Sequence, residues 1–391
     1  MVAVRGERWP SVVNVAQGFS PAIVIRCDGG ASVGMGHVSR CLALAEALRD
    51  DCACDVTFCM RDAGSAGVAA VRARGHTVTT IADREDADYG ASVLALTASL
   101  AARALVVDVR DALSRQSLDA VRASGVRVVT IDDGSDRRLA SDLAFYPPVP
   151  QVDEMDWTGF SGRRFTGWEW VLLKPEFAAD APVAQGPDHT VAQGSSAPAS
   201  RTAGAPGAQA FRPAEVSKTI DILLTMGGSD PAGMTEFALE ALNLLPTPQA
   251  VEVVIGPAFS RASTLTGIVA RSKHAVRVSQ GPEEMAPLMR ASRVAVASFG
   301  VSAYELAACG VPAVFLCLTA DHARSASAFD REQIAQSLGV FADVRPPHLA
   351  DAVASLLGDL ARMAKMAARA RTLIDGRGAN RVAALIVAGL S

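Results

Sequence analysis

The 391-residue chain lacks the features that mark several large classes of protein. Its 37 lysines and arginines are balanced by 41 aspartates and glutamates, so no broad positive charge indicates a nucleic-acid partner. No stretch reaches the roughly 18 apolar residues that a membrane-spanning helix needs. The N-terminal sequence MVAVRGERWPSVVNVAQGFSP has no apolar signal core. We therefore expect a cytoplasmic protein that neither spans a membrane nor binds nucleic acid.

The cysteine pattern and the known nucleotide motifs are equally sparse. Seven cysteines form no pair of CxxC units, and the CxC formed by Cys52 and Cys54 is weak evidence for a metal. Their odd number is typical of reduced thiols in the cytosol. No GK[ST] segment of a Walker A motif is present, and the first glycine-rich loop departs from the strict GxGxxG spacing of dinucleotide-binding proteins. We therefore expect no metal, and no cofactor such as NAD.

What the chain does contain is a regular alternation of apolar runs and amphipathic segments. The run AIVIRC reads as a buried strand, and HVSRCLALAEALRD, which follows it after a glycine-rich turn, has helical spacing. Strands that alternate with helices predict parallel, doubly wound α/β sheets. We expect the strands at 22–27, 54–60, 76–81, 104–109, 126–134, 219–230 (with its glycine turn), 251–256, 275–281, 294–300 and 312–318.

A low-complexity stretch divides this pattern in two. Residues 178–217 are rich in Ala, Pro, Gly and Ser and show no periodicity, which is typical of a flexible insertion or linker. We predict two Rossmann-like domains in tandem, at 21–177 and 218–391, preceded by a disordered N-terminal extension at 1–20. Ligands of such sheets bind beyond the carboxyl ends of the strands, so the cleft between the domains is the expected site.

Three loops share one design, in which small residues join a strand to the N-terminus of a helix. They are GGASVGMGH (29–37), MGGSDPAG (226–233) and SFGVSAYE (298–305). Small residues let backbone N–H groups approach an anion, and the helix dipole favours negative charge there. One such loop is more often only a turn, but three at strand ends favour a diphosphate ligand. The candidate binding residues in them are Gly34, Gly36, Gly227, Gly228, Ser229, Asp230, Ser298 and Gly300.

His37 stands where the first of these loops enters its helix, and two interpretations stay open. It can cap or pack against the helix start, or it can act as a general base. The partial positive charge of a helix N-terminus disfavours imidazolium, so a neutral imidazole is expected there. Asp28 is either a loop-capping carboxylate or the group that orients His37 or a substrate hydroxyl. We interpret His76 and His274, which lie at strand starts, as structural.

Several carboxylates also follow strands and would reach the same cleft. Ser302 and Glu305 fit an S-x-x-E capping box, or the Glu305 carboxylate accepts hydrogen bonds from ribose hydroxyls. Asp108 ends one strand, and Asp321 with His322 follows another. These five residues are therefore candidates for substrate binding.

Taken together, these motifs resemble a known family. The stretch RCDGGASVGMGHVSRCLALAEAL is similar to the signature of nucleotide-sugar hydrolases, represented by the UDP-2,4-diacetamido-2,4,6-trideoxy-β-L-altropyranose hydrolase family of the pseudaminic acid pathway. Related spore-coat polysaccharide biosynthesis proteins are similar as well. Further matching segments are IDDGSDRRLASDLAF, GWEWVLLKPEF, TMGGSDPAG and SFGVSAYELAACGVP. The resemblance spans nearly the whole chain apart from the N-terminal tail and residues 178–217.

The resemblance implies a GT-B fold and a UDP-sugar as the substrate. UDP would bind the C-terminal domain, with Gly227–Asp230 and Ser302–Glu305 holding the diphosphate and the ribose. The acylated amino-deoxy sugar would face the N-terminal domain, where Arg26 and Arg40 of the signature are expected to bind substrate. In this family the residue at His37 is taken to activate water, which attacks the anomeric carbon and expels UDP with inversion. We expect a monomer that needs no cofactor.

Two positions depart from the family pattern. Arg110 stands where the family carries a tyrosine, so it would bind the sugar, or instead pair with a carboxylate or with a phosphate. Asp321 and His322 replace an Asn-Gln pair of the family. Two alternative functions therefore stay open: a GT-B glycosyltransferase that uses a nucleotide-sugar donor, and a non-catalytic nucleotide-sugar-binding subunit.

Overall fold

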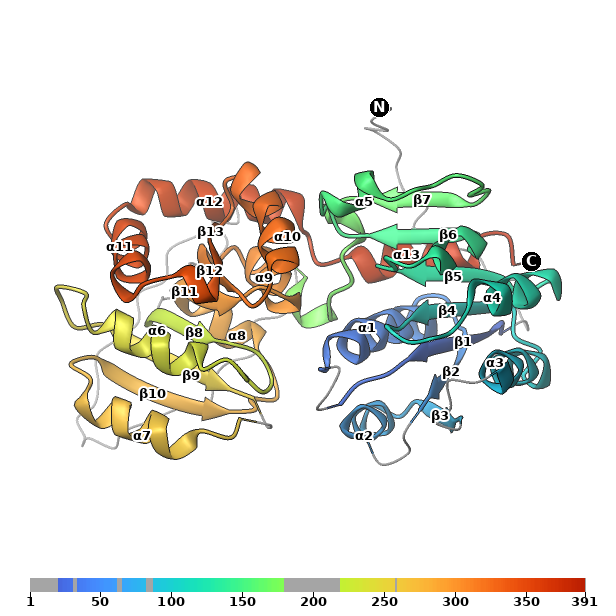
Figure 1. Ribbon diagram of the computed structural model, residues 1–391, viewed down its shortest axis with the longest axis horizontal. Coiled ribbons are helices and arrows are strands. Elements are labelled where there is room, and N and C mark those ends of the chain that lie inside the picture. Colours follow the sequence, from blue (N-terminus) through green and yellow to red (C-terminus); the bar gives the residue numbers. More distant parts are fainter. Residues whose placement is uncertain are drawn as a thin grey trace, which may run out of the picture.

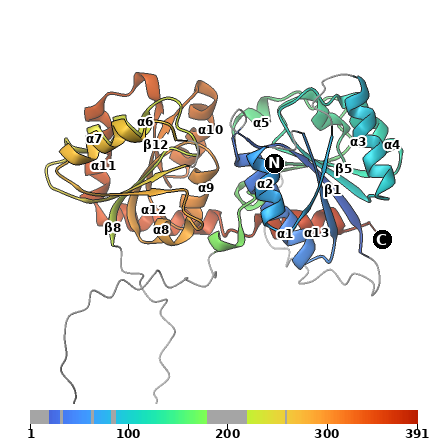
Figure 2. The same ribbon diagram turned by 90° about the horizontal axis from the view of Figure 1, so that it is seen from below.

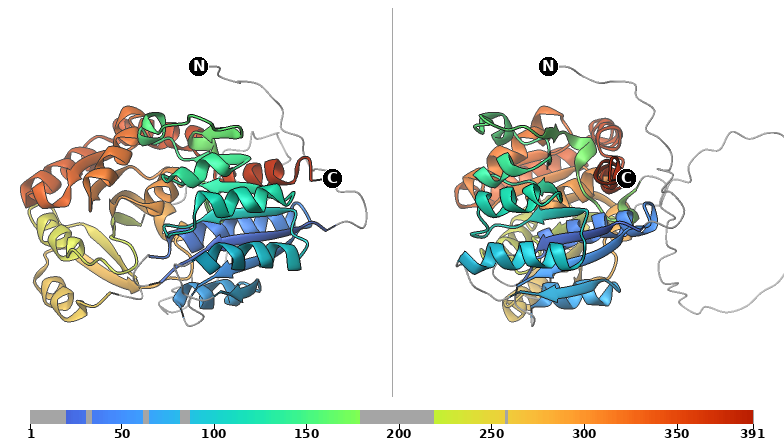
Figure 3. Two further views of the ribbon diagram at one scale, coloured as in Figure 1. Left: turned by 45° about the vertical axis from the view of Figure 1, so that its right-hand side comes forward. Right: turned by 90° about the vertical axis from the view of Figure 1, so that its right-hand side faces the viewer.

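The computed structural model describes residues 20–30, 34–61, 65–81, 87–178, 219–256 and 259–390. These residues form two α/β domains that lie side by side, each built on one sheet of parallel strands (Figure 1). Helices cover both faces of each sheet, as the turned views in Figure 2 and Figure 3 show. The predicted N-terminal extension and the predicted 178–217 linker lie outside the described residues, apart from Ser20 and Ala178.

The N-terminal sheet has the strand order β3-β2-β1-β4-β5-β6-β7. The order reverses between β1 and β4, which pair in parallel with Cys27 opposite Asp108. Such a reversal opens a crevice at the carboxyl ends of the two strands, where α/β proteins bind ligands. The strands are β1 (Ala22–Cys27), β2 (Asp55–Met60), β3 (Thr77–Thr80), β4 (Ala104–Asp108), β5 (Arg127–Ile131), β6 (Leu143–Tyr146) and β7 (Arg163–Thr166). The helices are α1 (Gly36–Asp50), α2 (Ala66–Ala73), α3 (Ala87–Ser99), α4 (Arg115–Ala123) and α5 (Gln151–Glu154).

The C-terminal sheet repeats this design with the order β10-β9-β8-β11-β12-β13. Its order reverses between β8 and β11, so this domain has a crevice of its own. The strands are β8 (Ile220–Thr225), β9 (Ala250–Ile255), β10 (Ala275–Gln280), β11 (Ser292–Ser298), β12 (Ala313–Cys317) and β13 (Gln336–Val340). The helices are α6 (Met234–Leu242), α7 (Ala262–Arg271), α8 (Ala286–Arg290), α9 (Val301–Ala308), α10 (Ala320–Arg331), α11 (Pro346–Leu357) and α12 (Leu360–Leu373).

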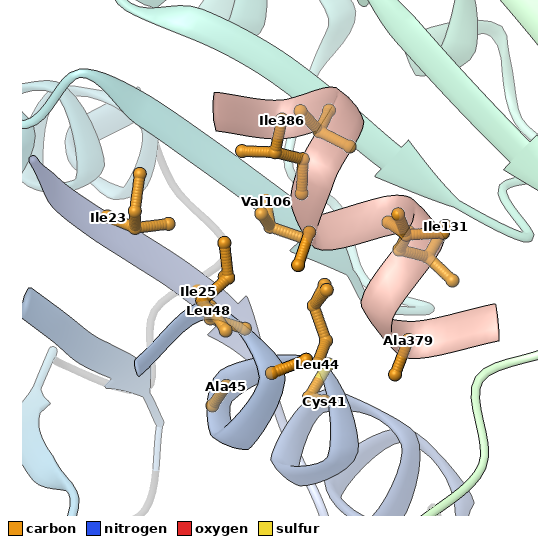
Figure 4. Packing of buried hydrophobic residues seen from close by; sticks show 14 of the residues in the cluster. Ile23, Ile25, Cys41, Leu44, Ala45, Leu48, Val106, Ile131, Ala379 and Ile386 are labelled. Atoms are coloured by element: carbon orange, nitrogen blue, oxygen red, sulfur yellow. The ribbon is translucent and has the colours of Figure 1, made fainter. Parts of the chain in front are cut away.

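The central strands are buried on both faces, which explains their nearly unbroken apolar runs. In β1, the side chains of Ile23, Val24 and Ile25 are all fully buried. Ile23 and Ile25 lie in the same cluster as Leu44 of α1, whereas Val24 belongs to a cluster on the opposite face of the sheet (Figure 4). The apolar run that predicts this strand therefore reflects packing against helices on two sides.

The last helix, α13 (Gly378–Val387), packs in the N-terminal domain although it follows the C-terminal one. Ile386 lies in the same buried cluster as Leu44 of α1 (Figure 4). Arg127, at the start of β5, donates from Nη1 to the carbonyl oxygen of Ile386 at 2.7 Å. The prediction that 218–391 forms one domain is therefore wrong at its C-terminal end, because α13 fills the apolar face beside α1.

The structure confirms each strand that the periodicity predicts, to within a few residues. The sequence does not predict β6, β7 or β13. Strands β6 and β7 have four residues each, and β13 is only partly buried throughout. A segment of four residues carries little pattern of its own, so the sequence can predict one such strand, β3, and miss two others, and an evenly exposed strand such as β13 shows no alternation.

Expectations about single residue types can also be compared with the structure. All seven cysteines are buried, and they are thiols rather than disulfides, as expected for reduced cysteines. Among the described residues, no helix combines the length and the apolar character that crossing a bilayer requires. His274 is structural, as predicted: Nδ1 accepts from the Gln249 N–H at 3.0 Å and Nε2 donates to the Leu242 carbonyl oxygen at 2.7 Å. His76 is buried against the ring of Phe58.

Candidate functional site

A cleft of about 1020 Å³ lies between the two domains. Its walls come from the loops that follow β1, β4, β5 and β6 on one side and β8, β11 and β12 on the other. These are the carboxyl ends of the strands, where the sequence predicts the ligand site. The volume is at the upper end of the range for small-molecule sites, roughly 300–1,000 Å³. The predicted site residues that line the cleft are Gly34, Gly36, His37, Arg40, Arg110, Gly228, Ser229, Gly300, Asp321 and His322.

His37 is the second residue of α1, and it meets Asp108, the last residue of β4. Nδ1 of His37 lies 2.7 Å from Oδ1 of Asp108, whose side chain is fully buried. An ionised carboxylate can only accept hydrogen bonds, so Nδ1 carries the proton and donates it. In the neutral form of this imidazole, Nε2 is the nitrogen without a proton, and it can take a proton from a ligand. His37 thus has the orientation that a general base needs, and Asp108, which does not line the cleft, holds it in that orientation. The predicted contact of Asp108 with a substrate stays a prediction.

Arg40 lies one helical turn after His37 and binds the same carboxylate. Its Nε donates to Oδ2 of Asp108 and its Nη2 to Oδ1, both at 2.5 Å. Burial raises the pKa of Asp108, but the Arg40 charge, its hydrogen bonds and the His37 hydrogen bond outweigh burial and hold that pKa well below its usual range. Asp108 is thus ionised at neutral pH and can stabilise a positive charge on His37.

Asp28 does not orient His37, contrary to one interpretation of the sequence. Its carboxylate accepts from Nη1 and Nη2 of Arg26 at 2.7 and 2.5 Å, and from the backbone N–H of Arg61 at 2.8 Å. Arg26 is fully buried in the sheet and also donates to Asp111 at 2.9 Å. A buried guanidinium needs several acceptors, and Asp28 supplies two of them. Neither residue lines the cleft, so the structure brings neither beside His37, and the predicted catalytic role of Asp28 and substrate contact of Arg26 stay predictions.

In the C-terminal domain, the loop after β8 brings small residues to the cleft. Gly228 and Ser229 line it, and Gly227 before them has a φ of +83°, which favours glycine. Asp230 turns away from the cleft, and its Oδ1 accepts from the backbone N–H of Met234 at 3.0 Å. Asp230 therefore caps α6 and does not line the cleft, and its predicted contact with the ligand stays a prediction.

The loop after β11 ends at Gly300, which lines the cleft directly before α9. Ser298 lies beside the loop after β8, because a Cβ atom added to Gly227 would be 3.8 Å from Oγ of Ser298. Because α9 begins one residue after Gly300, Ser302 is inside the helix and is not its N-cap. The capping-box interpretation of Ser302 and Glu305 is therefore wrong, and Ser302 instead hydrogen-bonds to the Glu305 side chain.

Glu305 is buried behind this loop and is not part of the cleft lining. Burial raises the pKa of Glu305 to about 7, although the Lys174 charge and the Ser302 hydrogen bond lower it. The carboxyl group is therefore partly protonated near neutral pH. Its contact with a ribose stays a prediction.

Arg110 pairs with a carboxylate, which was one of the alternatives for this departure from the family pattern. Its Nη1 and Nη2 donate to the carbonyl oxygen and to Oδ2 of Asp132, at 2.5 and 3.1 Å. Asp132 also accepts from Nη1 of Arg40 at 3.1 Å and has a left-handed φ of +51°, an uncommon backbone state outside glycine. The Arg110 side chain remains 47% exposed, so it can still reach a ligand in the cleft.

Sequence reasoning missed two residues that reach across the cleft. Gln151 of α5 donates from Nε2 to Oδ1 of Asp321 at 2.9 Å and so joins the two domains. Tyr304 of α9 is close enough to Asp132 for their charges to interact, and burial raises the pKa of its hydroxyl. The small-residue loop before α9 could have indicated Tyr304, whereas no local pattern marks Gln151. Within the described ranges, no three His, Cys, Asp or Glu side chains are grouped as metal ligands.

No protein-family model matches this chain. One relative, the uncharacterized protein MJ1062 of Methanocaldococcus jannaschii, is 30% identical over 101 residues, which are 25% of this chain and 21% of the relative. This chain therefore matches only about a fifth of the length of that relative.

Solved structures resemble nearly the whole chain. MurG of Acinetobacter baumannii has a TM-score of 0.63 at 16% identity, over 94% of this chain and 99% of its own. The glycotransferase of kitacinnamycin has a TM-score of 0.58 at 17% identity, over 94% and 98%. Anabaena HepE in complex with UDP-glucose has a TM-score of 0.55 at 13% identity, over 94% and 99%. At these identities the likeness shows the fold, and it confirms the predicted GT-B architecture of two doubly wound Rossmann-like domains.

Proposed function

We propose that this protein is an enzyme that breaks the bond between the sugar and the diphosphate of a nucleotide sugar, with UDP-sugars as the favoured substrates. The observation that carries the proposal is the pair of His37 and Asp108. A buried, ionised carboxylate orients an imidazole on the wall of a cleft large enough for such a ligand. A purely structural histidine would not need to stand at the carboxyl edge of the sheet, facing a second domain.

The C-terminal wall of the cleft suits the diphosphate. A Cβ added to Gly228 or Gly300 would meet no described atom within 4 Å, so the backbone at both positions is open to a ligand. Gly300 also stands at the N-terminus of α9, where N–H groups and the helix dipole favour an anion. HepE in complex with UDP-glucose, on the same fold, supports UDP as the nucleotide.

In the proposed reaction, Nε2 of His37 takes the proton of a nucleophilic hydroxyl group. The oxygen forms a bond to the anomeric carbon while the bond from that carbon to the diphosphate oxygen breaks, and the electron pair leaves with UDP. Attack on the face opposite the diphosphate inverts the configuration. Asp108 stabilises the imidazolium that forms, and backbone N–H groups at α9 stabilise the departing diphosphate.

Two nucleophiles are compatible with this geometry. Transfer to an acceptor hydroxyl is favoured by the fold shared with a glycotransferase and by the cleft volume, which leaves space beside a donor. Hydrolysis is the second candidate, because the sequence around His37 resembles hydrolases of acylated amino-deoxy sugars in surface-glycan pathways. A non-catalytic binding subunit is disfavoured, since it would not need an oriented imidazole.

Proton NMR of the wild-type protein with a panel of UDP-amino sugars tests this proposal. We expect release of UDP together with a product of inverted anomeric configuration. Release that depends on an added acceptor alcohol identifies a transferase, and release in water alone identifies a hydrolase. Binding of the UDP-sugars without turnover under either condition would contradict an enzymatic role.

A further inference from the structure

A contact between α5 and α10 joins the two domains at the cleft, and we call it the clasp. It consists of Gln151 and Glu154 of α5 with Asp321, Arg324 and Ser325 of α10, which lie on facing sides of the two domains (Figure 1). Nε2 of Gln151 lies 2.9 Å from Oδ1 of Asp321 and 2.8 Å from Oγ of Ser325. Glu154 and Arg324 form an ion pair whose side chains are 61% and 49% exposed. The clasp thus has an inner polar contact at the cleft and an outer ion pair in solvent.

Two polar atoms, one in Gln151 and one in His322, which follows Asp321, have no partner among the described residues. They are Oε1 of Gln151 and Nδ1 of His322, and both atoms are buried. Both residues line the cleft. Turning the Gln151 amide over would place Oε1 against the carboxylate and the carbonyl oxygen of Asp321. Leaving a buried polar atom without a hydrogen-bond partner costs more free energy than an exposed ion pair contributes. A ligand that supplies the missing partner therefore stabilises the clasp.

The surroundings define the chemistry of that partner. An amide oxygen only accepts hydrogen bonds, so the partner of Gln151 must be a donor. The neighbouring charge is the Asp321 carboxylate, and the basic side chain of the clasp, Arg324, is already paired with Glu154. An anionic group such as a phosphate is therefore disfavoured, and a hydroxyl or an amide N–H is favoured. In a nucleotide sugar whose diphosphate binds the glycine loops, such groups belong to the sugar.

We propose that Gln151 is a specificity-determining residue, which accepts a hydrogen bond from a hydroxyl or an amide N–H of the bound sugar. Oε1 belongs to a side chain that lines the cleft, so a ligand bound in the cleft is the candidate to supply its partner. Nδ1 of His322 is a second atom that this hydroxyl or amide N–H of the sugar can contact. The inference rests on the proposed function and adds to it the residue that distinguishes a UDP-sugar from UDP.

Calorimetric titration of the full chain with UDP and with UDP-N-acetylglucosamine tests this role. Gln151→Leu keeps a side chain of similar size and removes both polar atoms. We expect this variant to bind UDP-N-acetylglucosamine about 10-fold more weakly, the effect of one neutral hydrogen bond, and UDP within about two-fold of wild type. The matched control, Glu154→Gln, removes the outer ion pair from the same helix and should leave both affinities within about two-fold.

Three results would overturn the inference. Unchanged binding of UDP-N-acetylglucosamine by Gln151→Leu would mean that the amide does not contact the sugar. An equal loss of affinity for both ligands would mean that Gln151 only joins the domains. The same loss of affinity for UDP-N-acetylglucosamine in Glu154→Gln would mean this as well. In each of these cases the wild type still binds UDP and the proposed function stands. A wild-type protein that binds neither ligand would instead remove the proposed function, and this inference with it.

Discussion

The two walls of the cleft differ in chemistry although similar sheets support them. In the N-terminal wall, charged side chains bind one another: His37 and Arg40 bind Asp108, and Arg40 and Arg110 bind Asp132. In the C-terminal wall, the loops after β8 and β11 present small or apolar residues, while the segment after β12 adds the polar Asp321 and His322. The small or apolar residues are Gly228, Ser229, Phe299, Gly300 and Val301. The fold therefore fixes where a ligand lies, while the side chains at equivalent strand ends decide what happens to it.

The difference follows from what each part of the proposed substrate needs. An imidazole that accepts a proton needs an orienting carboxylate, and Asp108 stays ionised in its buried position because Arg40 and His37 bind it. A diphosphate needs N–H donors at close range, which a backbone without side chains provides. We therefore expect changes in the first wall to alter turnover and changes in the second to alter nucleotide affinity.

Replacing His37 by alanine should have the largest effect, and it should be confined to turnover. The rate should fall by roughly 10²–10⁴-fold because the base is lost, while the affinity for UDP stays within about two-fold because UDP binds the other wall. The turnover number and the dissociation constant of UDP, measured on one preparation, check both statements. Equal losses of turnover and of UDP affinity would contradict the placement of the base and of UDP on different walls.

Asp108→Asn tests the partner of the base. The amide cannot neutralise Arg40 and can hold the imidazole in the wrong tautomer, so we expect turnover to fall by about 100-fold or more. Stability should fall by roughly 3 kcal/mol or less, since the partly buried Arg40 keeps Asp132 as its one counter-charge among its described contacts. Activity assays and urea denaturation measure these effects. Asp28→Asn, which disturbs the fully buried Arg26, should lower stability but leave the turnover of the folded protein unchanged. A loss of turnover in this variant would contradict the assignment of Asp108.

Glu305 gives the C-terminal domain one ionisable group behind its apolar wall. Burial raises its pKa from 4.5 to about 7, so between these values the folded chain keeps a proton that the unfolded chain releases. This group should therefore lower the free energy of unfolding by about 2 kcal/mol as the pH rises from 5 to 7. Glu305→Gln should remove that contribution. Denaturation of both proteins at the two pH values measures it, and identical pH slopes would contradict it.

Gly300→Ala should have the smallest effect, and only on the ligand. The φ of Gly300 is 172°, which is extended backbone that alanine adopts, and the added Cβ meets no described atom within 4 Å. The methyl group would stand where the diphosphate approaches α9, so we expect UDP to bind about 10-fold more weakly, or about 1.4 kcal/mol. Calorimetry with UDP checks this. An unchanged affinity would mean that the diphosphate lies elsewhere.

Local pattern is sufficient for the central strands and for the loops at their ends. The strands are buried on both faces and so read as apolar runs. A strand that ends in small residues before a helix must deliver those residues to the carboxyl edge of a parallel sheet, which is how the sequence predicts the positions of His37, Gly228 and Gly300. The capping role of Asp230 is also local, because its carboxylate accepts from the backbone N–H of Met234, four residues later.

Contacts between residues that lie far apart in the chain could not be predicted from local sequence pattern. Asp28 and Asp108 both follow strands, and only the placement of β4 beside β1 brings Asp108 to His37, 71 residues away. Gln151 contacts Asp321 at a separation of 170 residues, across two domains. The apolar face of α13 fits either domain by its pattern alone, and packing beside α1 decides between them.

The central claim is that the diphosphate and the base occupy opposite walls of one cleft. A crystal structure of the His37→Ala protein with UDP-N-acetylglucosamine tests it most directly, because loss of the base preserves the nucleotide sugar. We predict that the diphosphate lies against Gly228, Ser229 and the N-terminus of α9, with the anomeric carbon facing the position of the missing imidazole. A nucleotide sugar bound outside the cleft, or with its anomeric carbon turned away from α1, would contradict that claim.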